Sequence, residues 1–205
     1  MEKEKILELF RTTGALQQGH FRLSSGLHSL EYFQCARVLQ FPQYSELLCG
    51  DIARFFHDWR VDIVLAPAIG GIMVGQEVSR QMRVRGNFAE RENDRMTLRR
   101  GFEVKPGERV LVCEDVVTTG GSVMEIIDLV KAAGGTVVGA AAVVDRSTKP
   151  VNFGAQFFSL LKMVVPVYKP EVCPLCEDKV PVIKPGSRQV DPPLADKKVV
   201  EPEKS

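Results

Sequence analysis

Three segments of strand length with apolar centres constrain the fold of this chain most. They are IVLAPA at 63–68, RVLVCED at 109–115 and TVVGAAAVVD at 136–145. The first two are followed by helical patterns, GIMVGQEVSRQMR and GSVMEIIDLVKAAGG, and NFAER at 87–91 is a further short strand. A strand buried on both faces is apolar throughout instead of alternating. The chain is therefore predicted to adopt an α/β fold, with a central parallel sheet, flanking helices and right-handed crossovers.

Smaller elements surround this unit. Apolar spacing predicts helices over Lys3–Thr13 and from Pro42 to about His57, with strands and turns over 15–40. Residues 92–103, ENDRMTLRRGFE, are polar although they lie between core strands, which indicates a mobile loop. Residues 187–205 have too little apolar surface to offset the entropy of ordering them, so a disordered tail is expected.

Composition narrows the function classes. The 205 residues are 44% apolar and 26% charged, which suits one domain, expected over 1–186. The net charge of +1 argues against a nucleic-acid partner, and no apolar run is long enough to span a membrane. The N-terminus lacks the apolar core of a signal peptide, so we expect a cytoplasmic protein with small-molecule partners.

An acidic pair, Glu114 and Asp115, ends the second core strand, and a small polar loop follows it. The loop, VVTTGGS at 116–122, offers successive backbone N–H groups, three hydroxyls and two glycines before a helix begins. Such a loop favours an anion, and two carboxylates beside it accept hydrogen bonds from the hydroxyls of a ribose. The arrangement therefore predicts a ribose 5-phosphate site, with a plain tight turn as the alternative. Neither G-x-x-x-x-G-K-[ST] nor a strand followed by G-x-G-x-x-G occurs.

The stretch VLVCEDVVTTGGS resembles the signature of the phosphoribosyltransferases that use phosphoribosyl pyrophosphate. FRLSSGLHSLEYFQ, LAPAIGG, ERENDRMTLRRGF and VVDRS extend the likeness to the bacterial orotate phosphoribosyltransferases, over about 5–186. The resemblance implies the type I phosphoribosyltransferase fold, with a small N-terminal hood over about 1–40, a flexible loop over about 92–103 and a homodimer. It also implies Mg²⁺, held mainly by substrate, and transfer of ribosyl 5-phosphate to orotate in UMP synthesis.

The resemblance also assigns site residues. Those for the phosphoribosyl donor are Glu114, Asp115, Val116, Val117, Thr118, Thr119, Gly120, Gly121, Ser122, Arg91, Gly70 and Gly71. Asp115, Arg91 and Arg95 are assigned to catalysis, with the arginines stabilising pyrophosphate charge electrostatically. The chain departs from many relatives in having no lysine at Gly70 or Ser24, and no lysine or histidine in the loop. We therefore expect magnesium and arginines to bear more of the leaving-group charge; a solvated charged loop is the alternative.

By the same resemblance, Arg146 and Thr118 contact orotate, and Tyr32 and Phe33 pack near the base. Arginine can hold a carboxylate through two parallel hydrogen bonds, and Arg146 directly follows a core strand. The alternative is that Arg146 only pairs with Asp145 or caps a turn. A purine-base phosphoribosyltransferase and a non-catalytic regulator that senses phosphoribosyl pyrophosphate are the rival functions.

The five cysteines, Cys35, Cys49, Cys113, Cys173 and Cys176, are scattered and read as thiols. Cys173 and Cys176 form a lone C-x-x-C. The histidines are His20, His28 and His57, and none stands at ligand spacing from this pair, so free thiols are favoured over a zinc site. No protein metal site is predicted.

Overall fold

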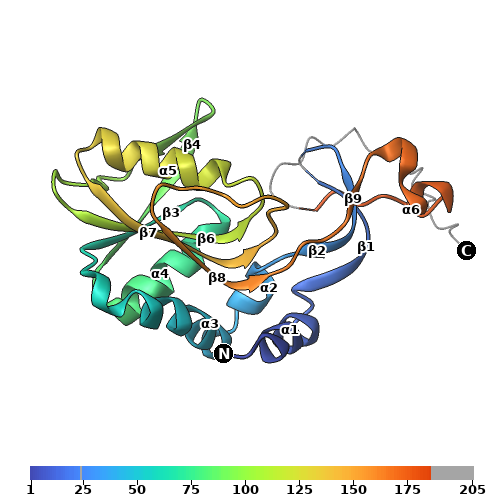
Figure 1. Ribbon diagram of the computed structural model, residues 1–205, viewed down its shortest axis with the longest axis horizontal. Coiled ribbons are helices and arrows are strands. Elements are labelled where there is room, and N and C mark those ends of the chain that lie inside the picture. The colour runs from blue at the N-terminus through green and yellow to red at the C-terminus, as the bar shows by residue number, and fades with distance from the viewer. Residues whose placement is uncertain (24, 186–205) are drawn as a thin grey trace, which may run out of the picture.

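The computed structural model describes residues 1–23 and 25–185, which form a large sheet with helices and a smaller sheet beside it (Figure 1). The predictions for Ser24 and for the tail over 187–205 lie outside the described residues. None of the helices in the described ranges has the length and apolar character that a membrane crossing requires.

The large sheet has six strands in the order β5-β4-β3-β6-β7-β8. Their bounds are Arg95–Leu98 (β5), Arg85–Glu92 (β4), Ile63–Pro67 (β3), Arg109–Val117 (β6), Thr136–Asp145 (β7) and Gln156–Lys162 (β8). Every neighbouring pair is parallel except β4 and β5, which are antiparallel. The predicted central parallel sheet is therefore confirmed. The sequence did not reveal β8 or the antiparallel edge strand β5.

Helices cover both faces of this sheet. Helix α5 (Gly121–Ala132) lies on one face, and α3 (Pro42–Phe55) and α4 (Gly70–Met82) lie on the other (Figure 1). Alternate residues of one strand enter different cores: Leu111 packs with α3 and α4, and Val112 packs with α5. Fully burying an aliphatic side chain stabilises the fold by about 1.5–3 kcal/mol, so a strand buried on both faces must be apolar throughout.

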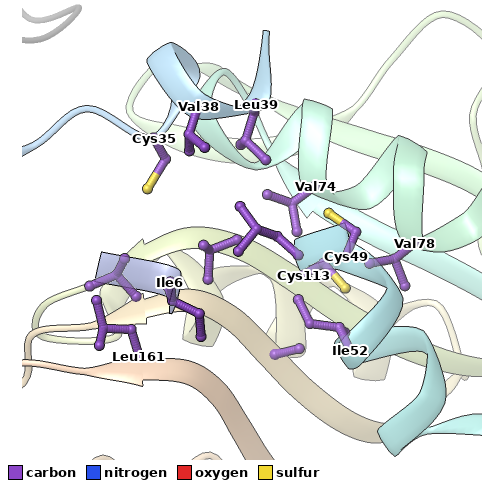
Figure 2. Close-up of a cluster of buried hydrophobic side chains, with 14 of the residues drawn as sticks. Ile6, Cys35, Val38, Leu39, Cys49, Ile52, Val74, Val78, Cys113 and Leu161 are labelled. Atoms are coloured by element: carbon purple, nitrogen blue, oxygen red, sulfur yellow. The ribbon is translucent and has the colours of Figure 1, made fainter. Parts of the chain in front are cut away.

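The larger core also includes the two remaining N-terminal helices, α1 (Lys3–Thr12) and the short α2 (Ala36–Leu39). Figure 2 shows Ile6 of α1 and Val38 of α2 within this cluster, which also contains Cys49 and Cys113. Both thiols are fully buried, and burial raises the pKa of Cys49 to about 12. The free cysteines expected from the sequence form no disulfide in the described part of the chain.

The smaller sheet is built from both ends of the described chain. Its strands, in the order β1-β2-β9, are Leu16–Arg22 (β1), His28–Phe33 (β2) and Val167–Tyr168 (β9). A 3₁₀ turn (Pro170–Val172) and the short helix α6 (Pro174–Glu177) follow β9. Ile183 then pairs with β1 through backbone hydrogen bonds to His20 and Arg22. We call this unit the hood; sequence reasoning expected its N-terminal strands but not its C-terminal part.

Residues 92–103 differ from the predicted loop. Residues 85–98 form a hairpin in which Glu92 pairs with Arg95, and residues 99–102 form a turn (Figure 1). Asn93 and Asp94 make the hairpin turn, with φ of 48° and 61°. A two-residue hairpin turn with both φ values positive favours asparagine and aspartate. The Asn-Asp pair was the turn signal in the sequence, and the polarity of the segment obscured it.

Candidate active site

Glu114 and Asp115 lie near the carboxyl end of β6, the end at which parallel sheets bind ligands. The Glu114 Oε1 accepts a hydrogen bond of 3.0 Å from the Asp115 N–H, and the Asp115 Oδ1 accepts one of 2.8 Å from the Val116 N–H. Burial raises the pKa of Glu114 well above its usual range, and the charge of Asp115 raises it further. Hydrogen-bond donors from a ligand would therefore stabilise this pair.

Gly70 and Gly71, at the start of α4, lie against the acidic pair. A Cβ atom on Gly71 would be 3.0 Å from the Cys113 carbonyl oxygen and 3.2 Å from the Glu114 Oε1, and one on Gly70 would be closer still to Asp115. The structure thus brings together the two glycines and the two carboxylates that the sequence assigned to one donor. The departure at Gly70 has a steric reason here, since a lysine side chain would start inside the space that Asp115 occupies.

The loop after β6 forms a small cavity of about 60 Å³. It is lined by Glu114 and residues 116–123. Gly120, the residue before α5, has φ of 80°, and a Cβ atom there would be 2.7 Å from Val151 and 2.8 Å from Phe153. Both the positive φ and the lack of space for a Cβ atom therefore require glycine at position 120. No side chain caps the N-terminus of α5 in the described structure, so its first N–H groups are available to an anion.

Arg146 lies beside this loop, because its N–H donates a hydrogen bond of 2.8 Å to the Val117 carbonyl. Its side chain is buried, and its Nε has no hydrogen-bond partner within 1–23 and 25–185. Asp145 is engaged elsewhere, accepting bonds from the Lys162 ammonium (2.6 Å) and the Ser147 N–H (2.8 Å). The pairing of Arg146 with Asp145 that the sequence left open is therefore absent. Lys162, which sequence reasoning missed, is the cation that satisfies Asp145.

Strand β2 of the hood brings aromatic side chains to the same place. The guanidinium carbon of Arg146 lies 5.7 Å from the centre of the Phe33 ring, within the range of a cation–π contact. Burial raises the pKa of Tyr32, the charge of Asp115 raises it further, and the charge of Arg146 lowers it. The charges of Asp115 and Arg146 therefore both act on Tyr32, which belongs to the hood.

The arginines of the hairpin and the turn after it differ in their partners. Arg91 donates to the Glu125 carboxylate of α5 at 2.8 Å and to the Asp94 carbonyl at 2.6 Å. Arg100 bonds both carboxylate oxygens of Glu90 at 2.8 Å, and Arg99 lies 3.5 Å from Glu92. Arg95 has no ion pair within the described part of the chain. Of the four arginines, Arg91 is thus the one fixed to α5, and Arg95 is the one left without a carboxylate.

The structure also brings two histidines to the lone C-x-x-C. His20, His28, Cys173 and Cys176 offer ligand atoms that all lie within 4.8 Å of one another. Sequence spacing, by which no histidine stands at ligand spacing from the two cysteines, therefore gave no sign of this proximity. The pairing of β1 with β2 and the packing of α6 against them set this proximity, and no local spacing in the sequence records it.

Comparisons with known proteins show which proteins this chain is similar to. Residues 45–169 match the family model of the phosphoribosyl transferase domain. The chain is 53% identical over 190 residues to the orotate phosphoribosyltransferase of Caldanaerobacter subterraneus, covering 93% of this chain and all of the relative. It is 54% identical to that of Pelotomaculum thermopropionicum over the same shares.

Solved structures show the same fold. Orotate phosphoribosyltransferase from Aeropyrum pernix aligns with a TM-score of 0.68 at 23% identity, over 77% of this chain and 93% of that one. The Mycobacterium tuberculosis enzyme in complex with inorganic phosphate aligns with a TM-score of 0.62 at 25% identity, over 78% and 95%. An adenine phosphoribosyltransferase from Thermoanaerobacter pseudethanolicus shares the fold at a TM-score of 0.56 and 17% identity.

Proposed function

The chain belongs to the orotate phosphoribosyltransferase family, and from this premise we propose which of its residues bind the two substrates and stabilise the transition state. The reaction of the family transfers ribosyl 5-phosphate from phosphoribosyl pyrophosphate to orotate, giving orotidine 5′-monophosphate and pyrophosphate. The observation that carries the assignment to residues is the buried Arg146 beside the loop that follows Glu114 and Asp115, because its Nε has no hydrogen-bond partner among residues 1–23 and 25–185.

The donor is bound at the end of β6. Residues 116–122, with the N-terminus of α5, hold the 5-phosphate through backbone N–H groups and the hydroxyls of Thr118, Thr119 and Ser122. Asp115 and Glu114 accept hydrogen bonds from the two ribose hydroxyls. The glycine at 120 supports this role, because a side chain there would collide with Phe153. Gly70 and Gly71 let backbone approach the pyrophosphate next to Asp115.

The base is read by Arg146. Orotate differs from uracil by a carboxylate, and a buried guanidinium whose Nε has no hydrogen-bond partner in the described part of the chain is suited to receive one. Burial lowers the pKa of Arg146, yet arginine stays protonated at any working pH, so the cost of its buried charge is offset when the carboxylate binds. Tyr32 and Phe33 pack beside the ring, and Thr118 contacts it. The purine-base alternative gains no support, because a purine has no carboxylate for this cation.

Mg²⁺ fits the oxygen donors of the site. This ion prefers one or two carboxylates together with substrate phosphates, and the described residues gather no cluster of three carboxylates at the end of β6. We therefore assign most of its ligands to the donor. When bound, Mg²⁺ would neutralise charge on the departing pyrophosphate.

The transfer itself requires charge stabilisation and exclusion of water. The bond from the ribose C1 to the pyrophosphate oxygen breaks as the ring nitrogen of orotate bonds to C1, through an oxocarbenium-like state. Arg91 is held on α5 by Glu125, where it is positioned to stabilise the leaving group. The hood covers the base side of the site, which limits hydrolysis of the activated ribosyl centre.

Arg95 acts in the partner subunit of a homodimer. Its lack of an ion pair in the described residues supports this role, since Arg99 and Arg100 have carboxylates of their own. Exposed apolar side chains of Ile69 and Met73, next to Gly70, offer a surface beside the site for a second subunit.

Steady-state assays with orotate, uracil, adenine and guanine, each with phosphoribosyl pyrophosphate and Mg²⁺, test the proposal. Orotate is expected to be the one base converted efficiently, and uracil should bind more weakly because it lacks the carboxylate. Conversion of adenine or guanine at the rate of orotate would contradict the assignment of Arg146. An inactive chain that still binds the donor would indicate a regulator.

A further inference from the structure

Four side chains with metal-binding atoms converge in the hood, at the end of β2 opposite to Tyr32 and Phe33. His20 lies in β1 and His28 in β2, while Cys173 directly precedes α6 and Cys176 lies in it. His20, His28 and Cys173 are buried, and Cys176 is half-buried. Neither the proposed substrates nor the transfer reaction uses any of these four residues.

The distances among the ligand atoms fit one ion. The His20 Nε2 lies 2.8 Å from the His28 Nδ1 and 3.5 Å and 3.6 Å from the sulfurs of Cys173 and Cys176. The Cys176 sulfur lies 3.2 Å from the His28 Nδ1. Zinc bonds of about 2.0–2.1 Å to nitrogen and 2.3 Å to sulfur, arranged as a tetrahedron, separate ligand atoms by about 3.3–3.8 Å. Small outward movements of the side chains would therefore admit a tetrahedral ion.

A hydrogen bond to the backbone determines which ring nitrogen of His20 faces the sulfurs without a proton. Its Nδ1 lies 2.7 Å from the Val180 carbonyl oxygen, which can only accept a hydrogen bond. The Nδ1 must therefore carry the proton, and in the neutral ring the lone pair is on Nε2, the atom that faces the two sulfurs. A backbone carbonyl in this position is the usual outer partner of a histidine that binds a metal.

We propose that His20, His28, Cys173 and Cys176 bind one structural Zn²⁺ ion. Two nitrogens and two sulfurs in a tetrahedral arrangement select zinc, and four protein ligands leave no open position for catalysis. An iron–sulfur cluster with two histidines and two cysteines would bind them on different irons, which the short distances between nitrogen and sulfur atoms exclude.

The ion would add to the limited hydrophobic packing at the end of the hood away from Phe33. Phe21 and Cys173 are buried but belong to neither of the two core clusters of the fold. Val172, Val182 and Ile183 in the C-terminal part are exposed. A small unit with few buried apolar side chains needs a cross-link for stability. A metal bound by residues of β1, β2 and α6 would link the C-terminal segment to the β1-β2 pair.

The first test is the metal content of the full chain, purified without an affinity tag that binds metals and without chelators. Mass spectrometry of the elements is expected to find about one zinc per chain. Replacement by Co²⁺ should give the strong visible absorption of a tetrahedral ion, with a thiolate charge-transfer band in the near ultraviolet. These readouts use the wild-type chain, so they do not depend on the folding of any variant.

The second test uses matched variants. Cys176→Ser and His28→Asn should reduce zinc affinity at least tenfold. Cys49→Ala, which removes a buried thiol from α3, and His57→Gln, which removes an exposed histidine, should retain zinc in full. A chelator should lower the thermal midpoint of the wild type and these controls by several degrees, and that of Cys176→Ser and His28→Asn by less.

Several results would overturn the proposal. A reduced wild-type chain that contains no zinc and takes up neither Zn²⁺ nor Co²⁺ stoichiometrically would do so, as would a disulfide between Cys173 and Cys176 in the freshly purified chain. Equal loss of zinc from the Cys49→Ala control and from Cys176→Ser would place the metal elsewhere.

Discussion

Asp115 lies directly against Gly70: a Cβ atom on Gly70 would be 2.6 Å from each carboxylate oxygen of Asp115. Gly70 begins α4 and Asp115 lies in β6, so the start of one helix and the end of the neighbouring strand form one wall of the site. The position of this carboxylate therefore depends on a glycine far away in the sequence.

Gly70→Ala should move the Asp115 carboxylate and raise the Michaelis constant for phosphoribosyl pyrophosphate at least tenfold, about 1.4 kcal/mol. The reason is steric, since no heavy atom tolerates a Cβ at 2.6 Å. Gly50→Ala in α3 is the control, because the Cβ there meets the flexible end of Gln81. Steady-state kinetics and circular dichroism of both variants measure the effect; unchanged donor kinetics in a folded Gly70→Ala chain would refute it.

Asp115→Asn should weaken the donor more than the base. The change removes a charged acceptor for a ribose hydroxyl, and hydrogen bonds to charged groups contribute about 1.5–3 kcal/mol. The Michaelis constant for the donor should therefore rise by about 10- to 150-fold. Asp128→Asn on the exposed side of α5 is the matched control. An unaltered donor constant would remove Asp115 from the proposed role.

The sheet and much of the site were predictable from sequence because both depend on local patterns. Strands such as β6 and β7 are buried on both faces and must be apolar, and the acidic pair and glycine loop follow β6 without a break. The alternation of strands with helices then predicted that neighbouring strands of the sheet run parallel. The predicted start of α3 at Pro42 is also a local signal, and it is confirmed.

The features that sequence reasoning missed depend on contacts between distant segments. The collision at Gly70 and the pairing of Asp145 with Lys162 join residues from different elements. The cluster of His20 and Cys173 depends on the C-terminal segment returning to β1, and no period in the sequence encodes that return.

Glu114→Gln should make the ligand-free chain more stable than the wild type at neutral pH, by an amount that grows with pH. The pKa of Glu114 is raised in the folded chain, mainly by burial, so folding favours its protonated form. That contribution is full below the usual value of 4.5 and is lost as the pH rises through the raised pKa. Glutamine keeps the shape without the charge.

Thermal unfolding from acid to neutral pH, compared between Glu114→Gln and the wild type, measures this difference. The exposed Glu8→Gln in α1 is the control and should follow the wild type at every pH. A constant difference across the pH range would show that Glu114 has no raised pKa in the folded chain.

Mixing subunits tests whether Arg95 acts across a dimer. Arg95→Ala and Asp115→Asn should each lose most activity when the donor concentration is near the wild-type Michaelis constant. If Arg95 serves the partner's site, one of the two sites in a mixed dimer contains both wild-type residues, so about half of the wild-type activity should return. If it acts in its own subunit, every site carries one change and nothing returns. Differently tagged subunits, purified as heterodimers, distinguish the two outcomes.

Arg146→Ala should raise the Michaelis constant for orotate at least tenfold, a loss of about 1.4 kcal/mol or more, with little change in donor binding. The guanidinium is buried, its Nε has no partner in the described structure, and Asp145 is taken by Lys162. The preference for orotate over uracil should fall, because uracil has no carboxylate and therefore loses no contact when the Arg146 side chain is removed. Arg11→Ala, on the exposed side of α1, is the control.

The thermal stability of the chain tests the role of Arg146 independently of kinetics. A buried charge without a partner costs folding free energy, so Arg146→Met, which keeps much of the volume, should raise the thermal midpoint of the ligand-free chain while impairing orotate binding. Such an opposite effect on stability and function is expected of a residue held ready for a ligand. Intact orotate binding with lost donor binding in Arg146→Ala, measured by titration, would show instead that Arg146 serves the phosphoribosyl donor and that the carboxylate of orotate is read by another group.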